Sequence, residues 1–376
     1  MGKKILIIAG EHSGDFYGAA LTKNLKSLDP TLEITGIGSE RMRKAGAVLL
    51  HDSSDWSAIG LLEASIKIPR LLWIFNNLKK YLRKHKQDLI VLIDFPTFNM
   101  RLARFARKSG MKSVYYFPPS AWTKKTDRAL EVSSTVDKVI TTFYYTREIY
   151  MKAGKEAAFF GHPIVGLLKP ELSREGVMEL FNISPDKKLI SIFPGSRVHE
   201  INTLLPVFIE SAKIISEKLS VQFAISCVSE YMEPSIRHCL ERYNFHAKVV
   251  TGYPYALMNV SCFIIATSGT ITLEAAYFGI PMVIGYKISP ISWFIARKTL
   301  DLPPYAGLPN LILQSKVIPE FIQNDLSPDS IAEKVLHILL NHEKIKKMKE
   351  DLKEVLKKLG PSDAGEKIAE EIYSMI

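Results

Sequence analysis

The chain has 376 residues, of which 47% are hydrophobic and 23% are charged, and its formal net charge is +10. This balance excludes extensive disorder, and at roughly 100–200 residues per domain the length favours two domains. Three scattered cysteines without a C-x-x-C pair argue against a disulfide framework or a zinc site and are typical of a reducing cytoplasm. The positive charge suits an anionic partner, such as nucleic acid, acidic lipid or a phosphorylated substrate, or it reflects a basic solvated surface.

Short apolar segments alternate with longer amphipathic stretches along most of the chain, which predicts strands followed by helices. We predict buried strands at residues 5–9, 89–93, 113–117, 138–141, 189–193, 221–226, 248–251, 262–266 and 281–286. Such runs suit parallel strands buried on both faces, so the sequence predicts an α/β protein with two doubly wound, Rossmann-like sheets. The first run is too short for a signal-peptide core, and no run reaches the roughly 18 apolar residues of a transmembrane helix.

The alternation of strands and helices pauses around residues 161–184, and we place a domain boundary in this pause. The prediction is an N-terminal domain at residues 1–165, a C-terminal domain at 166–345, and C-terminal helices at 346–376. Open parallel sheets bind ligands beyond the carboxyl ends of their strands, so two such domains facing one another would form a binding cleft. The informative residues should therefore follow the strands.

The first motif, Gly-Glu-His-Ser-Gly-Asp at residues 10–15, directly follows the first predicted strand. Its glycines allow a tight turn and a close approach to a ligand, and the next helix presents free N–H groups. The motif is not G-x-G-x-x-G, so a dinucleotide site is disfavoured. The alternative is a plain strand-to-helix turn in which Ser13 or Asp15 caps the helix.

The second motif, at residues 93–99, places Asp94 at the mouth of the strand predicted at 89–93. A carboxylate in this position is suited to act as a general base. The alternative is that Asp94 caps the following helix or forms an Asx turn. Position alone leaves both interpretations open.

The third motif, Phe-Pro-Gly-Ser-Arg at residues 193–197, opens the C-terminal domain in the manner of a phosphate-binding loop. Arg197 supplies a fixed positive charge there. The loop lacks the Lys-Ser/Thr of a P-loop, which argues against ATPase chemistry. A solvated arginine in a turn is the alternative.

The fourth motif, at residues 267–274, combines small hydroxyl residues and glycine at a predicted helix N-terminus, where they can hold an anion. Glu274 lies one helical turn beyond Thr270 and could hydrogen-bond a ribose. A plain helix start, capped by one of the hydroxyl residues, is the alternative. Lys287 and Asn310 are polar residues just past later apolar runs, and neither would mean much alone.

Residues 65–86 are predicted to form a helix that is interrupted near Pro69. One stripe of this helix should face the core, namely Leu71, Ile74, Phe75, Leu78 and Leu82. The apolar residues outside the stripe are Ile66, Ile68, Leu72 and Trp73. Trp73 lies nearly opposite the stripe, beside Lys80 and Lys84. Apolar side chains mixed with lysine suit a bilayer interface, while an oligomer contact or ordinary exposed residues are the alternatives.

Taken together, these motifs resemble the lipid-A-disaccharide synthase family, and they occur in the family's order over residues 9–310. The residues that carry the resemblance are Ala9-Gly10-Glu11-His12-Ser13-Gly14-Asp15, Ile93-Asp94-Phe95-Pro96-x-Phe98-Asn99, Pro119-Ser120-x-Trp122, Gly161-His162-Pro163, Pro194-Gly195-Ser196-Arg197-x-x-Glu200, Ser268-Gly269-Thr270-x-Thr272-Leu273-Glu274, Pro281-Met282-Val283-x-Gly285-Tyr286-Lys287 and Leu308-Pro309-Asn310. Each motif is weakly specific by itself, and the ordered set is strong.

The resemblance implies a glycosyltransferase B fold whose last helices cross back to the first domain. It implies an inverting transfer of 2,3-diacylglucosamine from UDP-2,3-diacylglucosamine to 2,3-diacylglucosamine 1-phosphate (lipid X), with neither metal nor cofactor. The products would be the β-1,6-linked disaccharide 1-phosphate and UDP. The family works at the cytoplasmic face of the inner membrane, so a cytoplasmic, membrane-peripheral protein is implied. A homodimer stays open, and no nucleic-acid partner is expected.

The site residues implied by the resemblance fall into three groups. The catalytic group is Asp94, Glu11, Ser13 and His12. The substrate- and UDP-binding group is Gly14, Asn99, Ser196, Arg197, Glu200, Ser268, Gly269, Thr270, Thr272, Glu274, Lys287 and Asn310. The membrane-facing group is Ile66, Ile68, Leu72 and Trp73. Asp94 would deprotonate or orient the acceptor 6-hydroxyl, with His12 open as the base instead, and Arg197 with helix-terminal N–H groups would stabilise the leaving UDP in place of a metal.

Three departures from the family pattern fall in the predicted acceptor domain. Thr97 stands where a second aspartate is usual, and Tyr144 stands where a glutamate is common. Thr123 and Lys124 stand where Ala-Trp is usual. The donor is therefore better supported than the acceptor. The alternatives are another UDP-sugar enzyme of this fold, such as a peptidoglycan-type glucosaminyltransferase or a UDP-sugar 2-epimerase, and a non-enzymatic basic protein that binds nucleic acid or membrane.

Overall fold

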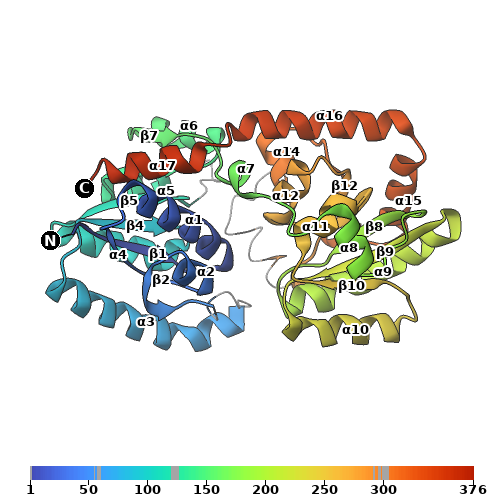
Figure 1. Cartoon of the computed structure of the whole chain (residues 1–376), viewed down its shortest axis with the longest axis horizontal. Helices are drawn as coiled ribbons and strands as arrows, with labels where there is room; N and C mark the ends of the chain where they lie inside the picture. The colour runs from blue at the N-terminus through green and yellow to red at the C-terminus, as the bar shows by residue number, and fades with distance from the viewer. Residues whose placement is uncertain are drawn as a thin grey trace. The chain divides into compact units, whose positions relative to one another are not determined.

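The computed structural model describes residues 2–54, 56, 61–119, 127–290, 293–294, 298 and 305–376, without the side chains of residues 12 and 61–67. The chain divides into two compact units (Figure 1). The N-terminal unit is Met1–Leu167 with Lys358–Ile376, and the C-terminal unit is Leu168–Lys357. Within the described residues, no helix combines the length and the apolar character needed to cross a bilayer.

The N-terminal unit is built on a seven-stranded parallel sheet in the order β3-β2-β1-β4-β5-β6-β7. Its strands are β1 (Lys4–Ala9), β2 (Glu33–Gly38), β3 (Val48–Asp52), β4 (Leu89–Ile93), β5 (Lys112–Tyr116), β6 (Lys138–Thr141) and β7 (Ala157–Phe159). Its helices are α1 (His12–Leu28), α2 (Glu40–Lys44), α3 (Leu61–Lys84), α4 (Pro96–Lys108), α5 (Asp127–Thr135), α6 (Tyr144–Lys152), α7 (Ile164–Leu167) and α17 (Ala364–Tyr373). The strand order reverses between β1 and β4, which is where ligands bind in open sheets of this kind.

Two layers of helices cover this sheet. In Figure 1, α17 (red) lies beside α1 (dark blue), and α3 lies on the opposite side of the sheet. β1 and β4 are apolar and almost wholly buried, as expected for strands covered on both faces. Their ends are adjacent because Ala9 pairs with Ile93. The loops that follow β1 and β4 therefore emerge side by side.

Helix α3 follows the predicted pattern in its buried stripe but not at Pro69. Ile74, Leu78 and Leu82 are buried in the core, and Leu71 and Phe75 pack against it. The predicted interruption is wrong, since α3 runs continuously through Pro69. Pro69 is exposed, so the helix loses one backbone hydrogen bond on its outer side while the buried stripe that follows holds the next turns.

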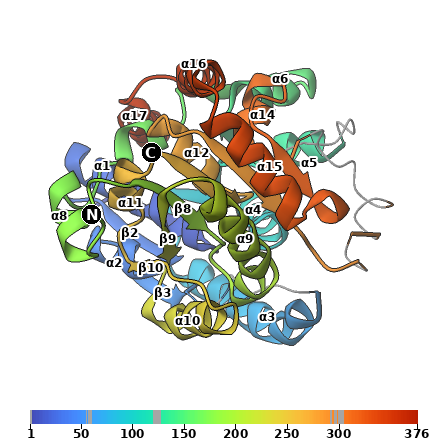
Figure 2. The ribbon, with the colours of Figure 1, turned by 90° about the vertical axis from the view of Figure 1, so that its right-hand side faces the viewer.

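The C-terminal unit is built on a six-stranded parallel sheet in the order β10-β9-β8-β11-β12-β13. Its strands are β8 (Lys188–Phe193), β9 (Val221–Cys227), β10 (Lys248–Thr251), β11 (Phe263–Thr267), β12 (Met282–Tyr286) and β13 (Glu320–Ile322). Its helices are α8 (Arg174–Leu180), α9 (Val198–Lys218), α10 (Glu233–Arg242), α11 (Pro254–Val260), α12 (Ile271–Tyr277), α14 (Leu308–Leu313) and α15 (Pro328–Leu339), with short 3-10 turns at Glu230–Met232 and Gln323–Asp325. Helices α9 and α15 lie side by side (Figure 2). Two doubly wound parallel sheets confirm the predicted fold class.

The last long helix, α16 (His342–Leu359), belongs mostly to the C-terminal unit. Met348, Leu352 and Val355 are buried, and the Met348 Sδ accepts a hydrogen bond from the Met282 N–H at 3.3 Å. The predicted boundary at residue 346 falls inside this helix, whereas the compact units divide between Lys357 and Lys358. A continuous amphipathic helix stays with the core that buries its apolar face.

Candidate active site

In the N-terminal unit, the turn after β4 is strained. Asp94 and Phe95 both have φ of 47°, the left-handed region that non-glycine residues rarely adopt. The Asn99 side-chain amide donates to the main-chain oxygens of Ile93 at 3.1 Å and Asp94 at 2.7 Å. The Tyr115 hydroxyl donates to the same Asp94 oxygen at 2.7 Å. Two buried side chains therefore hold the turn that presents the Asp94 carboxyl.

The Phe95 side chain explains why a glycine ends the neighbouring strand. A Cβ at Gly10 would overlap the ring of Phe95. That ring also lies 5.5 Å from Trp56 and 6.0 Å from Phe98, measured between ring centroids. The left-handed turn thus directs Phe95 into an aromatic cluster and leaves Asp94 half-buried beside it.

The environment of Asp94 favours its protonated form. Burial and, to a smaller extent, the negative charge of Glu11 raise the pKa of its carboxyl from the ordinary 3.8 to about 6, while the Phe95 N–H opposes the shift. A carboxyl whose pKa lies near neutrality can take up and release a proton at working pH. The geometry thus joins the two motifs that the sequence placed after β1 and β4.

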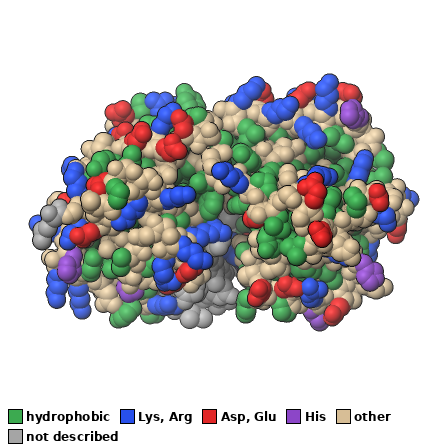
Figure 3. Space-filling view, viewed as in Figure 1, with side chains coloured by type: hydrophobic (Ala, Val, Ile, Leu, Met, Phe, Trp, Pro, Cys, Tyr) green, Lys and Arg blue, Asp and Glu red, His purple; other side chains and the backbone are tan. Residues whose placement is uncertain are grey.

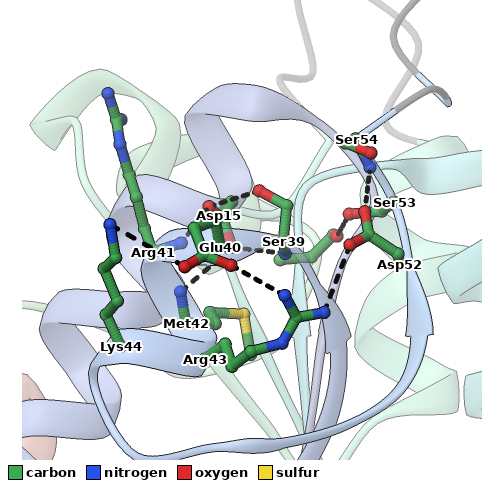
Figure 4. A network of polar contacts seen from close by, with 11 residues as sticks. Asp15, Ser39, Glu40, Arg41, Met42, Arg43, Lys44, Asp52, Ser53 and Ser54 are labelled. Atoms are coloured by element: carbon green, nitrogen blue, oxygen red, sulfur yellow. Dashed lines mark hydrogen bonds and ion pairs between the residues drawn. The ribbon is translucent and has the colours of Figure 1, made fainter.

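The first motif also has a structural role that the sequence did not reveal (Figure 4). The buried Asp15 carboxylate accepts from the Ser39 N–H at 2.6 Å and the Ser39 hydroxyl at 2.7 Å, and from the N–H groups of Arg41 at 3.2 Å and Met42 at 3.3 Å. Asp15 therefore caps α2, which packs beside its own helix, α1. The proposed capping of α1 by Ser13 or Asp15 is wrong, because the N-cap of α1 is Glu11, without a side-chain capping bond.

The other residues predicted around the first motif are placed as follows. Glu11 and Ser13 are half-buried at the start of α1, and Gly14 is buried against Ala9. The side chain of His12 lies outside the described residues. So do Thr123 and Lys124, which together form one of the three departures from the family pattern. The other two, Thr97 and Tyr144, are exposed.

His162, from the Gly-His-Pro motif, is a core residue. Its ring packs edge-on against Tyr17 and Phe117, with centroids 5.6 and 5.5 Å away. Its Nδ1 accepts from the Ile164 N–H at 3.2 Å, and burial lowers the pKa of the imidazole to about 3. His162 is therefore neutral at physiological pH and helps to support the loop after β5.

In the C-terminal unit, the loop after β8 is organised by Glu200. Its carboxylate accepts from the Ser196 N–H at 2.9 Å and from the Arg197 Nη1 at 2.8 Å. Gly195 has φ of 123°, and a Cβ there would overlap the Glu200 carboxylate. Glu200 thus orients Arg197, whose guanidinium stays partly exposed while the acid is largely covered. Burial and Glu200 raise the pKa of Tyr286, which sequence reasoning did not single out as a site residue.

In and just after the loop that follows β11, some residues of the fourth motif are exposed and others are buried. Gly269 and Thr270 are exposed, and Gly269 has φ of 153°. Thr272 is fully buried and its hydroxyl donates to the Gly269 oxygen at 2.8 Å. The Ser268 hydroxyl donates to the Ala306 oxygen at 2.6 Å, and Thr270 is the N-cap of α12 without a side-chain capping bond. Glu274 is half-buried.

Asn310 is buried, and both polar atoms of its side-chain amide make hydrogen bonds within the protein. Its amide nitrogen donates to the Ile318 oxygen and the Glu320 carboxylate, both at 2.7 Å. Its amide oxygen accepts from Ile318 and Val317 N–H groups at 2.7 and 2.9 Å. Glu320, which the sequence did not flag, also accepts from the N–H groups of Ala306 at 3.0 Å and Gly307 at 2.8 Å. The pair therefore fixes the loop that receives Ser268.

Lys287 and the predicted membrane-facing residues lie at the surface. Lys287 is exposed just beyond β12. The exposed fractions are 51% for Ile68, 42% for Leu72 and 60% for Trp73. The Trp73 ring has an edge contact with His51 at 5.8 Å between centroids. The side chain of Ile66 lies outside the described residues.

Comparison with known proteins covers nearly the whole chain. The family model described as lipid-A-disaccharide synthetase matches residues 5–372. The lipid-A-disaccharide synthase of Geobacter sulfurreducens is 35% identical over 374 residues, which are 99% of this chain and 97% of the relative.

Two solved structures share the fold at low sequence identity. A UDP-GlcNAc 2-epimerase from Neisseria meningitidis, bound to UDP-GlcNAc, superimposes with a TM-score of 0.70 at 14% identity, covering 99% of this chain and 100% of that one. A calicheamicin glycosyltransferase gives 0.61 at 14% identity, covering 100% and 98%. These likenesses show the glycosyltransferase B type of fold alone.

Proposed function

Because the chain belongs to the lipid-A-disaccharide synthase family, we propose that its acceptor is 2,3-diacylglucosamine 1-phosphate and its donor UDP-2,3-diacylglucosamine. The chain is a glycosyltransferase of lipid A disaccharide synthesis. The products are the β-1,6-linked disaccharide 1-phosphate and UDP.

The observation that carries the mechanism is the Asp94 carboxyl, held on a strained turn with its pKa raised to about 6. At neutral pH most of this carboxyl is ionised, yet it is basic enough to accept a proton. Asp94 takes the proton of the acceptor 6-hydroxyl while that oxygen bonds to the anomeric carbon of the donor. The bond from that carbon to UDP breaks with its electron pair, which inverts the configuration.

The donor half of the proposal rests on Arg197 and the loop after β11. UDP leaves with negative charge on its diphosphate, and a fixed guanidinium stabilises that charge in the transition state. Glu200 holds Arg197 in place, and the exposed Gly269 and Thr270 offer backbone groups near a helix start. Lys287 supplies a further exposed cation. We assign none of these roles to a metal ion or cofactor.

The alternative activities are not favoured. The likeness to a UDP-sugar 2-epimerase is one of fold, at 14% identity, whereas the match to the lipid A enzymes extends over the whole chain. The first experiment is UDP release from UDP-2,3-diacylglucosamine with and without lipid X. Release that depends on lipid X and yields a disaccharide supports the proposal, whereas release without lipid X supports the epimerase or another acceptor.

We further propose that the exposed apolar side of α3 attaches the enzyme to the cytoplasmic face of the inner membrane. Trp73 lies on the helix side opposite the buried stripe, Ile68 and Leu72 are also exposed, and Lys80 and Lys84 are exposed further along. Apolar side chains near lysines suit an interface of acidic phospholipids. The same surface would also serve a homodimer.

The docking proposal is tested with the double variant Leu72→Ser/Trp73→Ser and liposomes containing phosphatidylglycerol. We expect a several-fold loss of liposome binding. The matched control is Tyr231→Ser/Leu340→Ser, since Tyr231 is 82% and Leu340 69% exposed in the C-terminal unit. Unchanged binding of the first variant refutes the proposal, and a change in its mass by light scattering assigns the surface to a dimer instead.

A further inference from the structure

The C-terminal unit contains a cavity whose lining includes none of the residues proposed to bind UDP. Its volume is about 640 Å³, and it lies between α15, α16, β13 and the segment before β13. This volume is within the roughly 300–1,000 Å³ of small-molecule sites. Its apolar wall includes Pro319, Phe321 and the buried Ile338 and Met348. The cavity is thus large enough for a small ligand and has a packed floor.

Four lysines from three parts of the chain line this cavity. Lys316 comes from the segment after α14, Lys334 from α15, and Lys344 and Lys347 from α16. Lys347 is paired with Asp351 at 2.8 Å. Lys316 and Lys334 have no carboxylate within ion-pair distance among the residues that the structure describes.

The third lysine without a carboxylate partner meets a histidine. The Lys344 Nζ contacts the Nε2 of His337, which also lines the cavity. Both side chains can turn toward an incoming acceptor at little cost, because each is at least partly exposed.

The acidic residues of the cavity do not balance these cations. Glu320 is engaged by the N–H groups of Ala306 and Gly307, and Asp351 by Lys347. Glu343 is the remaining carboxylate of the lining. Figure 3 shows basic and acidic side chains near one another along the top of the C-terminal unit, where α16 lies in Figure 1. Apart from the Lys347–Asp351 pair, the lining therefore holds three lysines and two carboxylates.

We propose that this cavity binds a phosphate group, either of a small soluble phosphorylated compound or of a phospholipid head. Three ammonium groups in the lining of one cavity, those of Lys316, Lys334 and Lys344, provide up to nine N–H donors for the oxygens of a dianion. Arg197 and Ser268 do not line this cavity, although Glu320 of its lining also holds the loop that receives the Ser268 hydroxyl.

The test uses inorganic pyrophosphate as the probe, added to the full-length protein in the presence of saturating UDP, which occupies the donor loops. Calorimetry should show binding to the wild-type protein and at least tenfold weaker binding to Lys316→Ala/Lys334→Ala. The matched control is Lys346→Ala/Lys349→Ala, two exposed lysines of α16 outside the cavity. This control should bind pyrophosphate within about twofold of wild type.

A second arm distinguishes the two sources of phosphate. Phosphatidylcholine vesicles with and without phosphatidylglycerol are offered to the same variants in the Leu72→Ser/Trp73→Ser background. If the protein binds pyrophosphate and Lys316→Ala/Lys334→Ala does not change the amount of protein bound to vesicles, the ligand is a soluble compound. If Lys316→Ala/Lys334→Ala loses vesicle binding and the control pair does not, the ligand is a phospholipid head. Absence of both effects, or equal loss in the control pair, overturns the proposal.

Discussion

Replacing Asp94 with asparagine should abolish transfer and at the same time stabilise the protein. The variant keeps the size and polarity of the side chain but removes a carboxyl whose ionised form is disfavoured by burial and by Glu11. Its main-chain bonds from Asn99 and Tyr115 are unaffected. The expected gain therefore comes from charge alone.

The size of the gain follows from the shift in pKa. A rise from 3.8 to about 6 corresponds to up to about 3 kcal/mol at 1.36 kcal/mol per unit. Because the folded pKa is the higher one, the folded state binds more protons between these values, and the free energy of unfolding falls as pH rises through that window. The free-energy cost of keeping the Asp94 carboxyl ionised in the folded protein is complete above about pH 6 and absent below about pH 4. Asp94→Asn should thus be more stable at pH 7.5 and equal to wild type near pH 4.

The assay is denaturant unfolding of both proteins at pH 4.5, 6 and 7.5, with a titration of UDP at pH 7.5. Asp186→Asn is the control, since that aspartate is exposed. UDP affinity should stay within twofold of wild type, because the donor loops lie in the other unit. If Asp94→Asn is less stable than wild type at pH 7.5, or if its gain in the free energy of unfolding is the same at every pH, the ionised Asp94 carboxylate does not destabilise the folded protein. Retained transfer would remove it as the base.

Three further substitutions test the groups that position Asp94 in the N-terminal unit and the proposed UDP-binding loops in the C-terminal unit. Tyr115→Phe removes the hydroxyl bond to the Asp94 main chain, so turnover should fall about tenfold and stability by about 1 kcal/mol, with UDP affinity unchanged by titration. Gly195→Ala adds a Cβ at φ of 123° against the Glu200 carboxylate, so UDP affinity should fall by roughly 1–3 kcal/mol, and wild-type affinity would refute the link to Arg197. Asn310→Asp sets two carboxylates together in the core, and urea unfolding should show a loss of about 3 kcal/mol or more.

The fold was predictable where strands are long and buried. Uniformly apolar runs such as β4 marked the sheet interiors, because strands covered on both faces show no alternation. The strands that were missed are short or lie near an edge. β7 and β13 have three residues each, and β2 contains Gly36, where a Cβ would lie 2.6 Å from the Ile7 oxygen. A glycine required by close strand packing weakens the strand signal in the sequence.

The site was predictable as a set of loops and less so as a set of contacts. Spacing placed every motif after a strand, but it could not show which side chains point inward. Asn99, Glu200, Thr272 and Asn310 were predicted to bind substrate or UDP, which stays a prediction, and each also makes hydrogen bonds within the protein that the sequence did not reveal. Their most informative partners are distant in sequence, as Tyr115 is from Asp94. A motif alone does not reveal bonds of that kind.

The two units support their exposed groups by the same physical means. The Tyr115 hydroxyl donates a hydrogen bond to the Asp94 main-chain oxygen, and the Arg197 guanidinium donates one to the Glu200 carboxylate. In each case a costly backbone conformation, a left-handed aspartate or a glycine with positive φ, positions the reactive or charged group. Such conformations persist only where the surroundings over-determine them, so the buried partners are as necessary as the exposed groups. Loss of activity in a variant of Tyr115 would therefore reflect misplacement of Asp94, and its acid-side pH profile should keep the value near 6 that Asp94 sets.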